Sequence, residues 1–266
     1  MTGERTDEAQ CECTVERCDI FDFMALHVGL TVIHPGGLKA TRALADSCHL
    51  DERARVADIA CGKGTSAIYL AENYGCKVVG IDISPDLIAQ ATRLAAKRRV
   101  KGLVDFLVGD ALDLPFSDGE FDCAVSQAML VLVADKRQAI REALRVTKPG
   151  GHLGWLELSW TRSPTAEFLA AVSDVLCARC MRNVGTFQQW EELLSEVGVR
   201  DVRVLAHPLG RVGMFSMLAD EGLINTTRAL FKHLTDARIR RRMNTMDRFF
   251  KSHAQQFGYG IYTGTK

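Results

Sequence analysis

The chain has 266 residues, of which 47% are hydrophobic and 25% are charged, as in an ordinary globular protein with a sizeable core. Lys and Arg number 33, the same as Asp and Glu, so no overall positive field favours nucleic acid as a partner. No apolar run approaches the roughly 20 residues of a membrane span, and the polar N-terminus lacks the apolar stretch of a secretory signal.

The N-terminal region is expected to be a flexible tail followed by a helical cover. Residues 1–18 are polar and include three of the nine cysteines. Residues 19–33 are apolar enough for a helix that packs on the body of the protein, the HPGG sequence at 34–37 predicts a turn, and residues 38–49 predict a second helix. The predicted cover is therefore residues 19–50.

From Val56 onward, short apolar runs alternate with helical patterns. Five apolar runs predict strands at 56–60, 77–82, 104–109, 121–127 and 152–158. Helices are predicted between them at 64–74, 85–98 and 135–146. Ser84 followed by Pro85 is typical of a helix start, and the KPGG sequence at 148–151 is expected to end a helix before the fifth strand. Such an alternation indicates a parallel sheet that is covered by helices on both faces.

The rest of the chain predicts further helices and two more strands, the helices at 164–182, 186–197 and within 213–256 and the strands at 201–207 and 259–266. The last strand follows a long excursion, so it is free to enter antiparallel. The predicted fold class is α/β, with a seven-stranded, mostly parallel sheet, helices on both faces, N-terminal helices and a helical insert before the last strand. The core is predicted at 51–207, the insert at 208–257 and the final strand segment at 258–266.

A turn of small residues between the first strand and the next helix is the candidate binding site. Open α/β sheets bind ligands at the carboxyl ends of their strands, where Asp58 and the turn at 60–64 are expected. Glycine permits unusual φ angles and lets a ligand approach the backbone, and the following helix directs its positive end at the same space. Asp82 ends the next strand, where an acid can accept hydrogen bonds from two ribose hydroxyls.

Two ligands compete for this arrangement. A dinucleotide site has the pattern G-x-G-x-x-G, but the chain reads A-x-G-x-G-T from Ala60, so the third glycine is missing. Asp58 is also poorly placed for a pyrophosphate, whereas a cationic ligand tolerates an acid there. S-adenosylmethionine has a ribose, a sulfonium and no phosphate, so it suits the site better, and a nicotinamide oxidoreductase is the weaker alternative.

Four ordered motifs carry a resemblance to a known family. They are VADIACGKG at 56–64, GIDIS at 80–84, GDALDLPFSDGEFD at 109–122 and RVTKPGGHLGWLE at 145–157. The region from 56 to 160 resembles the class I S-adenosylmethionine-dependent methyltransferases, in particular the small-molecule group of the ubiquinone and menaquinone methylases. Ala60 stands where the family usually has its first glycine. The resemblance covers about 40% of the chain and implies a Rossmann-like sheet.

The resemblance also implies a role for each residue of the cofactor site. The turn would shape the methionine end, Asp82 would bind the ribose hydroxyls beside Ile83 at the adenine, and Asp110 would accept from the adenine amino group. Two residues after the fourth strand would line the floor near the methyl group. The full set is Asp58, Ala60, Gly62, Gly64, Asp82, Ile83, Asp110, Ala111, Ser126 and Gln127.

The expected reaction is an in-line displacement of the methyl group from a sulfonium, which benefits mainly from alignment and water exclusion. A base is needed only if the acceptor must lose a proton early. The candidate catalytic residues are His34 in the HPGG turn and Glu157 at the end of the fifth strand. The alternative interpretations are a histidine that caps a helix and a solvated strand-end acid.

The helical insert has two alternative interpretations of its own. It is rich in Met and Phe, which suit an adaptable apolar lid over a quinone-like, natural-product or amine acceptor. A hairpin that buries its own apolar stripe and a homodimer contact are alternatives. A basic face within 238–251 predicts a solvated surface or, less favourably, a peripheral membrane contact.

The cysteines raise one more alternative. An odd number of them, with several in predicted strands, indicates reduced thiols of a cytoplasmic protein. No metal site is predicted, because the spacings of Cys11, Cys13, Cys18, Cys177 and Cys180 do not match a structural zinc site. These cysteines nevertheless leave an arsenite, metalloid or thiol methyltransferase as an alternative. A non-catalytic module that only binds the cofactor is the other.

Overall fold

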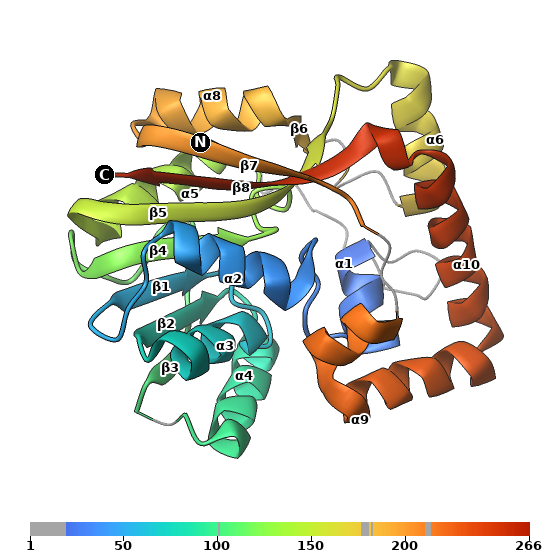
Figure 1. The fold of residues 1–266 in the computed structure, drawn as a ribbon, viewed down its shortest axis with the longest axis horizontal. Helices are drawn as coiled ribbons and strands as arrows, with labels where there is room; N and C mark the ends of the chain where they lie inside the picture. The colour runs from blue at the N-terminus through green and yellow to red at the C-terminus, as the bar shows by residue number, and fades with distance from the viewer. Residues whose placement is uncertain (1–19, 101, 177–180, 182, 211–213) are drawn as a thin grey trace, which may run out of the picture.

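The computed structural model describes residues 20–100, 102–176, 181, 183–210 and 214–266. Its centre is one sheet in which the main strands follow the order β3-β2-β1-β4-β5-β8-β7, with a short β6 paired to β5 (Figure 1). The strands are β1 (Arg55–Ile59), β2 (Lys77–Asp82), β3 (Val104–Val108), β4 (Phe121–Gln127), β5 (Thr147–Trp160), β6 (Gly185–Thr186), β7 (Arg200–Pro208) and β8 (Phe257–Thr265). The predicted fold class is confirmed, and the two-residue β6 is an addition that no pattern indicated.

The strand directions follow from the connections. The four neighbours β3, β2, β1 and β4 run parallel to one another, and β5 runs parallel to β4. The last strand, β8, lies between β5 and β7 and is antiparallel to both. The sequence left this strand free to enter antiparallel, and it does so.

Helices cover both faces of the sheet. On one face α2 (Gly37–Ser47), α3 (Thr65–Tyr74) and α4 (Pro85–Arg98) pack with strand side chains such as Val56 and Val125. On the other face α5 (Lys136–Val146) and α8 (Phe187–Val197) pack with Ala57, Ala124 and Trp155. The two apolar layers bury the central strands on both sides, as their continuous apolar sequences predicted.

The first predicted helix is shorter than expected. Among the described residues, which begin at Ile20, α1 (Ile20–Asp22) and a π-helical segment, η1 (Phe23–Val28), lead to the left-handed Gly29, whose φ is 94°. The backbone N–H groups of Thr31 and Val32 donate to the Glu221 carboxylate instead of to helix carbonyls, at 2.7 and 2.9 Å. A contact across 190 residues thus overrides the local helical pattern.

The fifth strand is longer than expected. The sequence at 148–151 was predicted to lie before it, but β5 begins at Thr147 and continues through these residues to Trp160. The pairing with β4 shifts register between Phe121 and Cys123, which makes room for Gly150 at a φ of 74°. A bulge of this kind lets a proline and two glycines remain within a strand.

The insert between β7 and β8 consists of two helices. They are α9 (Met214–Thr235) and α10 (Ala237–Ser252), followed by the short η2 (Ala254–Gln256). Figure 1 shows α9 and α10 beside the sheet, with α9 near α1 and α10 near α6 (Ala166–Leu176). Among the described residues, no helix is long and apolar enough to cross a membrane.

Candidate active site

The turn between β1 and α3 contains three residues in the left-handed region. Ala60, Gly62 and Gly64 have φ values of 61°, 55° and 75°. Ala60 pays about 1–2 kcal/mol for this conformation, because its Cβ crowds the following carbonyl. The turn reverses the chain at the carboxyl end of β1, the place that the sequence predicted for a binding site.

The two glycines of this turn have different surroundings. A Cβ at Gly62 would meet no atom within 4 Å, whereas a Cβ at Gly64 would lie 2.5 Å from the Phe106 ring and 2.8 Å from Ala91. Gly64 is therefore required by the packing of α3 against α4 and β3. Gly62 leaves its backbone open to a ligand.

Asp82 ties the turn to the end of β2. Its Oδ2 accepts a hydrogen bond from the Gly62 N–H at 2.9 Å, and its Oδ1 accepts one from the Ser84 N–H at 3.0 Å. A carboxylate offers about four lone-pair sites, so each oxygen keeps capacity for a further donor. The side chain is 8% exposed, which leaves that capacity at the edge of the site.

Apolar side chains lie next to this carboxylate. Ile83 is 70% exposed, and Val108, which pairs with Asp82 across β2 and β3, is 49% exposed. Asp110 and Ala111 follow on the loop after β3, where the exposed Asp110 accepts a hydrogen bond from the Leu112 N–H at 2.9 Å. Val108 was not predicted as a site residue, because only the pairing register places it beside Asp82.

Asp58 is a buried carboxyl with an unsatisfied oxygen. It lies within β1, is 2% exposed, and its Oδ2 has no hydrogen-bond partner. Burial raises the pKa of Asp58 to about 7, and repulsion from the Asp82 carboxylate adds to this rise. An ionised carboxylate in this position is stabilised by a cation, so the site favours a positively charged ligand group.

His34 belongs to a hydrogen-bonded cluster at the end of β4. Its Nε2 lies 3.2 Å from Thr41 Oγ1 and 3.3 Å from Ser66 Oγ, and Thr41 Oγ1 donates to Gln127 Oε1 at 2.8 Å. Burial lowers the pKa of His34 to about 4, so the ring is neutral at pH 7. Thr41 and Ser66 were not predicted, because a single polar residue in a helix carries no signal of function.

The floor of the site has two further unsatisfied groups. Gln127 Nε2 and Ser126 Oγ, at the end of β4, are buried without a hydrogen-bond partner. Ala128 follows with a φ of 59°, and its N–H donates to the Leu156 carbonyl at 2.7 Å. The strained backbone at Ala128 ends β4 beside Leu156, which lies within β5.

Glu157 was expected as an acid at the end of the fifth strand, and this position is wrong, because β5 continues to Trp160. The side chain is fully buried, and its Oε1 accepts hydrogen bonds from the N–H groups of Met129 and Leu130 at 3.0 and 2.8 Å. Burial raises the pKa of Glu157 to about 8, although these hydrogen bonds oppose the rise. The carboxyl therefore acts on the site through the loop after β4.

Two lysines hold the N-terminal cover over the turn. Lys63 Nζ donates to the carbonyls of Ala25 and Leu30 at 2.9 Å each, and Lys232 Nζ donates to the His27 carbonyl at 2.7 Å. One lysine comes from the Gly turn and the other from α9. The cover is thus fastened to both sides of the molecule.

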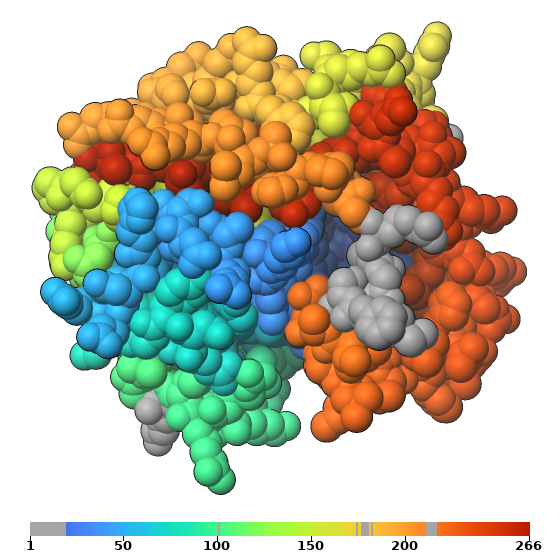
Figure 2. Space-filling view, viewed as in Figure 1, coloured from blue at the N-terminus to red at the C-terminus, as the bar shows by residue number. Residues whose placement is uncertain are grey.

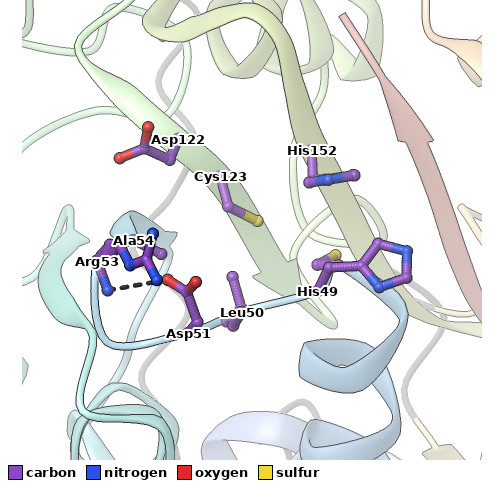
Figure 3. Close-up of a pocket in the computed structure, with 9 residues that line it drawn as sticks. His49, Leu50, Asp51, Arg53, Ala54, Asp122, Cys123 and His152 are labelled. Carbon is purple, nitrogen blue, oxygen red and sulfur yellow. Dashed lines mark hydrogen bonds between the residues drawn. The ribbon is translucent and has the colours of Figure 1, made fainter.

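Two cavities lie outside this cluster. The smaller, about 180 Å³, is lined by Cys48, His49, Asp122, Cys123 and His152 (Figure 3). It lies where β4 begins, whereas the turn lies at the carboxyl end of the parallel neighbour β1. The larger, about 460 Å³, lies between α3, the cover and the start of α9, with Thr31, Thr65 and Asp220 in its wall. Neither lining includes a residue assigned to the site, although Thr65 of the larger cavity directly follows Gly64 of the turn.

The described cysteines provide no metal centre. Cys48, Cys61, Cys76 and Cys123 are free and buried, and the described part of the chain has no group of three or more His, Cys, Asp or Glu that could hold a metal ion. The cysteines on which the metalloid alternative rests, Cys11, Cys13, Cys18, Cys177 and Cys180, lie outside the described residues.

The sheet order, the Gly turn and the acid at the end of β2 define the fold of a class I methyltransferase, and the comparisons agree. Residues 57–154 match the family described as "Methyltransferase domain". An uncharacterized protein of Haemophilus influenzae is 28% identical over 79% of this chain and 83% of its own length. Norajmaline N-methyltransferase of Rauvolfia serpentina is 31% identical over 62% of this chain and 58% of its own length.

A solved structure shows the same fold. Phosphoethanolamine N-methyltransferase 2 of Haemonchus contortus, in complex with phosphomonomethylethanolamine and S-adenosylhomocysteine, superposes with a TM-score of 0.72 at 18% identity, over 91% of this chain and 56% of that one. The chain spans little more than half the length of these two named enzymes. Residues 57–154 thus match a methyltransferase domain, and the fold over most of the chain is that of the class I S-adenosylmethionine-dependent methyltransferases.

Replacement of Glu157 by alanine is expected to destabilise the protein by about 3 kcal/mol, because two buried N–H groups lose their acceptor. Glu157→Gln keeps one acceptor oxygen and should remain close to wild type at about pH 5.5. Urea unfolding measures both variants. If Glu157→Ala unfolds at the same urea concentration as wild type, the hydrogen bonds from Met129 and Leu130 to Glu157 do not contribute to stability.

A comparison of wild type with Glu157→Gln tests the ionisation of Glu157. Its pKa is raised in the folded state, so its contribution to the free energy of unfolding is fully present below pH 4.5 and is lost as pH rises toward about 8. Wild type should therefore lose stability relative to Glu157→Gln over this range. An unchanged difference between the two at about pH 5.5 and about pH 9 would contradict the raised pKa.

Proposed function

We propose that the protein transfers a methyl group from S-adenosylmethionine to a small-molecule acceptor. The observation that supports this most directly is the open backbone of Gly62 near two acids. Asp82 accepts a hydrogen bond from the Gly62 N–H, and Asp58 has a buried oxygen without a hydrogen-bond partner. These features fit a ligand with hydroxyl donors and a positive charge. The bound cofactor supplies an electrophilic methyl group on a sulfonium.

We assign the nucleoside end of the cofactor to the ends of β2 and β3. The free lone pairs of Asp82 would accept the ribose hydroxyls, and the exposed Ile83 and Val108 would pack on the adenine. Asp110 would accept from the adenine amino group, with Ala111 beside it. Apolar side chains with a small number of placed polar groups are the usual lining of a small-molecule site.

We assign the methionine end to the turn and to Asp58. Ala60 and Gly62 would shape the backbone around it, while Gly64 positions α3. Burial deprives the Asp58 carboxylate of the stabilisation that water gives a charge. The cationic groups of the bound cofactor would provide that stabilisation instead. Unliganded, this carboxyl is a source of instability that binding relieves.

The acceptor would lie over the end of β4. Gln127, with its unsatisfied Nε2, and the loop that Glu157 holds form the floor there. Burial lowers the pKa of His34 to about 4, which makes its ring a weak base. The ring also contacts two hydroxyls already, so we assign it to orienting Gln127 and the acceptor and not to proton removal. The protein would therefore act mainly through alignment and water exclusion.

The acceptor class that we propose is an amine or a natural-product nucleus of small size, with a quinone-like ring as a further member. The likeness to norajmaline N-methyltransferase supports an amine. We also propose a cytoplasmic location, since the described thiols, among them the buried neighbours Cys48 and Cys123, are unpaired.

Asp82→Asn should weaken the binding of S-adenosylhomocysteine by roughly 10- to 100-fold, because a hydrogen bond to a charged acceptor is lost and the turn loses an anchor. Asp105→Asn, at an exposed acid in the neighbouring strand β3, is the matched control and should bind as wild type does. Isothermal calorimetry measures both. Unchanged binding by Asp82→Asn would reject the site assignment.

Methyl transfer itself is tested with a labelled methyl donor and a panel of amines, phenols and hydroquinones. Product is expected from at least one class with wild type and, at saturating donor, from Asp105→Asn. If wild type binds S-adenosylhomocysteine but methylates nothing in the panel or in a metabolite extract, the non-catalytic alternative stands instead.

Asp58 should make cofactor binding depend on pH. The carboxyl is neutral well below pH 7 and ionised above it, so the affinity for S-adenosylmethionine should fall as pH drops through about 7. Asp58→Asn should bind more weakly at about pH 8 and show no such fall. Because the buried charge is gone, the variant without ligand should also unfold at a higher temperature than wild type at that pH. Calorimetry and thermal unfolding check the two effects, and equal pH profiles would refute the role of Asp58.

A further inference from the structure

The outer face of α9 is apolar, which is unusual for the exposed side of a helix. After the break in α9 at Gly222, four large side chains are between 63% and 74% exposed, namely Leu223, Ile224, Phe231 and Leu234. Leu230 at their edge is 43% exposed. These positions recur with helical spacing and form one face, called here the α9 ridge (Leu223, Ile224, Leu230, Phe231 and Leu234). The helix runs along the lower right of the molecule (Figure 2).

The ridge faces away from the protein because the opposite side of α9 packs against the protein. Thr226 and Ala229 are 7% and 3% exposed and point inward, as does Lys232, which binds the His27 carbonyl. The neighbouring α10 has the usual arrangement, with its apolar Ile239, Met246 and Phe249 buried. A contiguous set of exposed apolar side chains of this size marks an interaction surface.

The charges around the ridge are almost all positive. Residues 223–242 contain six Lys and Arg and only one acid, Asp236. Two of the six are turned toward the protein, since Lys232 binds the His27 carbonyl and the Arg242 guanidinium lies over the Phe23 ring. Arg228 and Arg241 are exposed, and Arg240 donates to the Leu234 carbonyl at 2.8 Å, which fixes its guanidinium at the end of the ridge. Asp236 is occupied by the N-terminus of α10 and by Arg238. The ridge is therefore an apolar strip with a basic border.

We propose that the α9 ridge is a docking surface for an anionic lipid bilayer. Ile224, Phe231 and Leu234 would enter the boundary between headgroups and acyl chains. Arg228, Arg240 and Arg241 would lie at the lipid phosphates. An apolar helix face with basic flanks is the pattern of a helix that lies in the plane of a membrane surface.

A second copy of the chain fits the ridge less well. A two-fold contact through α9 would place the same basic border of both copies side by side, so like charges would oppose each other. A bilayer with acidic headgroups offers the opposite charge. The charge pattern therefore selects the membrane over self-association.

The helix that carries the ridge also contacts the N-terminal cover. Asp220 and Glu221, just before the break in α9, accept hydrogen bonds from the backbone of Leu38 and of Thr31 and Val32. The helix that would touch the bilayer thus holds the N-terminal cover on its inner side. The docking proposal does not depend on methyl transfer.

Co-sedimentation of the full chain with lipid vesicles tests the proposal. Wild type should bind vesicles of equal parts phosphatidylcholine and phosphatidylglycerol at low salt, and bind pure phosphatidylcholine far more weakly. The double variant Ile224→Ser with Phe231→Ser should lose roughly tenfold or more in partitioning. The double variant Arg228→Gln with Arg241→Gln should lose roughly tenfold or more at low salt and less at high salt.

Leu205→Ser, on the exposed strand β7, is the matched control and should bind vesicles as wild type does. All the substituted side chains are exposed, so unchanged melting temperature and unchanged S-adenosylhomocysteine binding are expected and show that the fold is intact. These readouts also separate a failure of docking from a failure of the proposed enzymatic function.

Three results would overturn the proposal. They are no binding of wild type to anionic vesicles at low salt, equal binding to neutral vesicles, and equal loss with Leu205→Ser. A dimer in sedimentation velocity that Ile224→Ser with Phe231→Ser converts to monomer, without vesicle binding by wild type, would assign the ridge to self-association instead.

Discussion

The hydrogen bonds that Asp82 accepts from the backbone of Gly62 and Ser84 hold the candidate site together. They join the turn after β1 to the end of β2, so that the turn, the start of α3 and the start of α4 form one rigid edge. A carboxylate that accepts two backbone N–H groups resists displacement more strongly than a neutral acceptor does. The residues assigned to the nucleoside lie at the end of β2, which belongs to this edge, and at the end of the neighbouring β3.

The same edge carries an electrostatic cost. Burial disfavours ionisation of the Asp58 carboxyl and so raises its pKa, and the charge of the nearby Asp82 adds to this effect. A protein selected only for stability would place an apolar residue at this position of β1. The cost is explained if a positive ligand group completes the site, which is the usual way in which binding sites retain local instability.

Long-range polar contacts close the site from above. Lys63 in the turn and Lys232 in α9 bind carbonyls of the same N-terminal segment, and Glu221 in α9 accepts from its backbone N–H groups. The segment has little regular structure of its own, so its shape depends on these partners. The cover and α9 are therefore joined directly by hydrogen bonds.

The elements that sequence patterns located accurately are those whose signals are local. The strands at 77–82 and 121–127 and the helix at 85–98 have the predicted bounds, since an apolar strand and a capped helix start are encoded within a few residues. Ser84 shows this directly, because its side chain accepts from the Leu87 N–H within the same turn. The Gly turn and its acids were located by the same kind of signal. Only the tertiary fold decided the rest: that Glu157 faces inward to the loop after β4, that His34 meets Thr41 and Ser66, and that residues 29–33 do not continue the predicted helix, with Thr31 and Val32 bound to Glu221. These outcomes depend on partners up to 190 residues away, and no pattern in a short window of sequence contains that information.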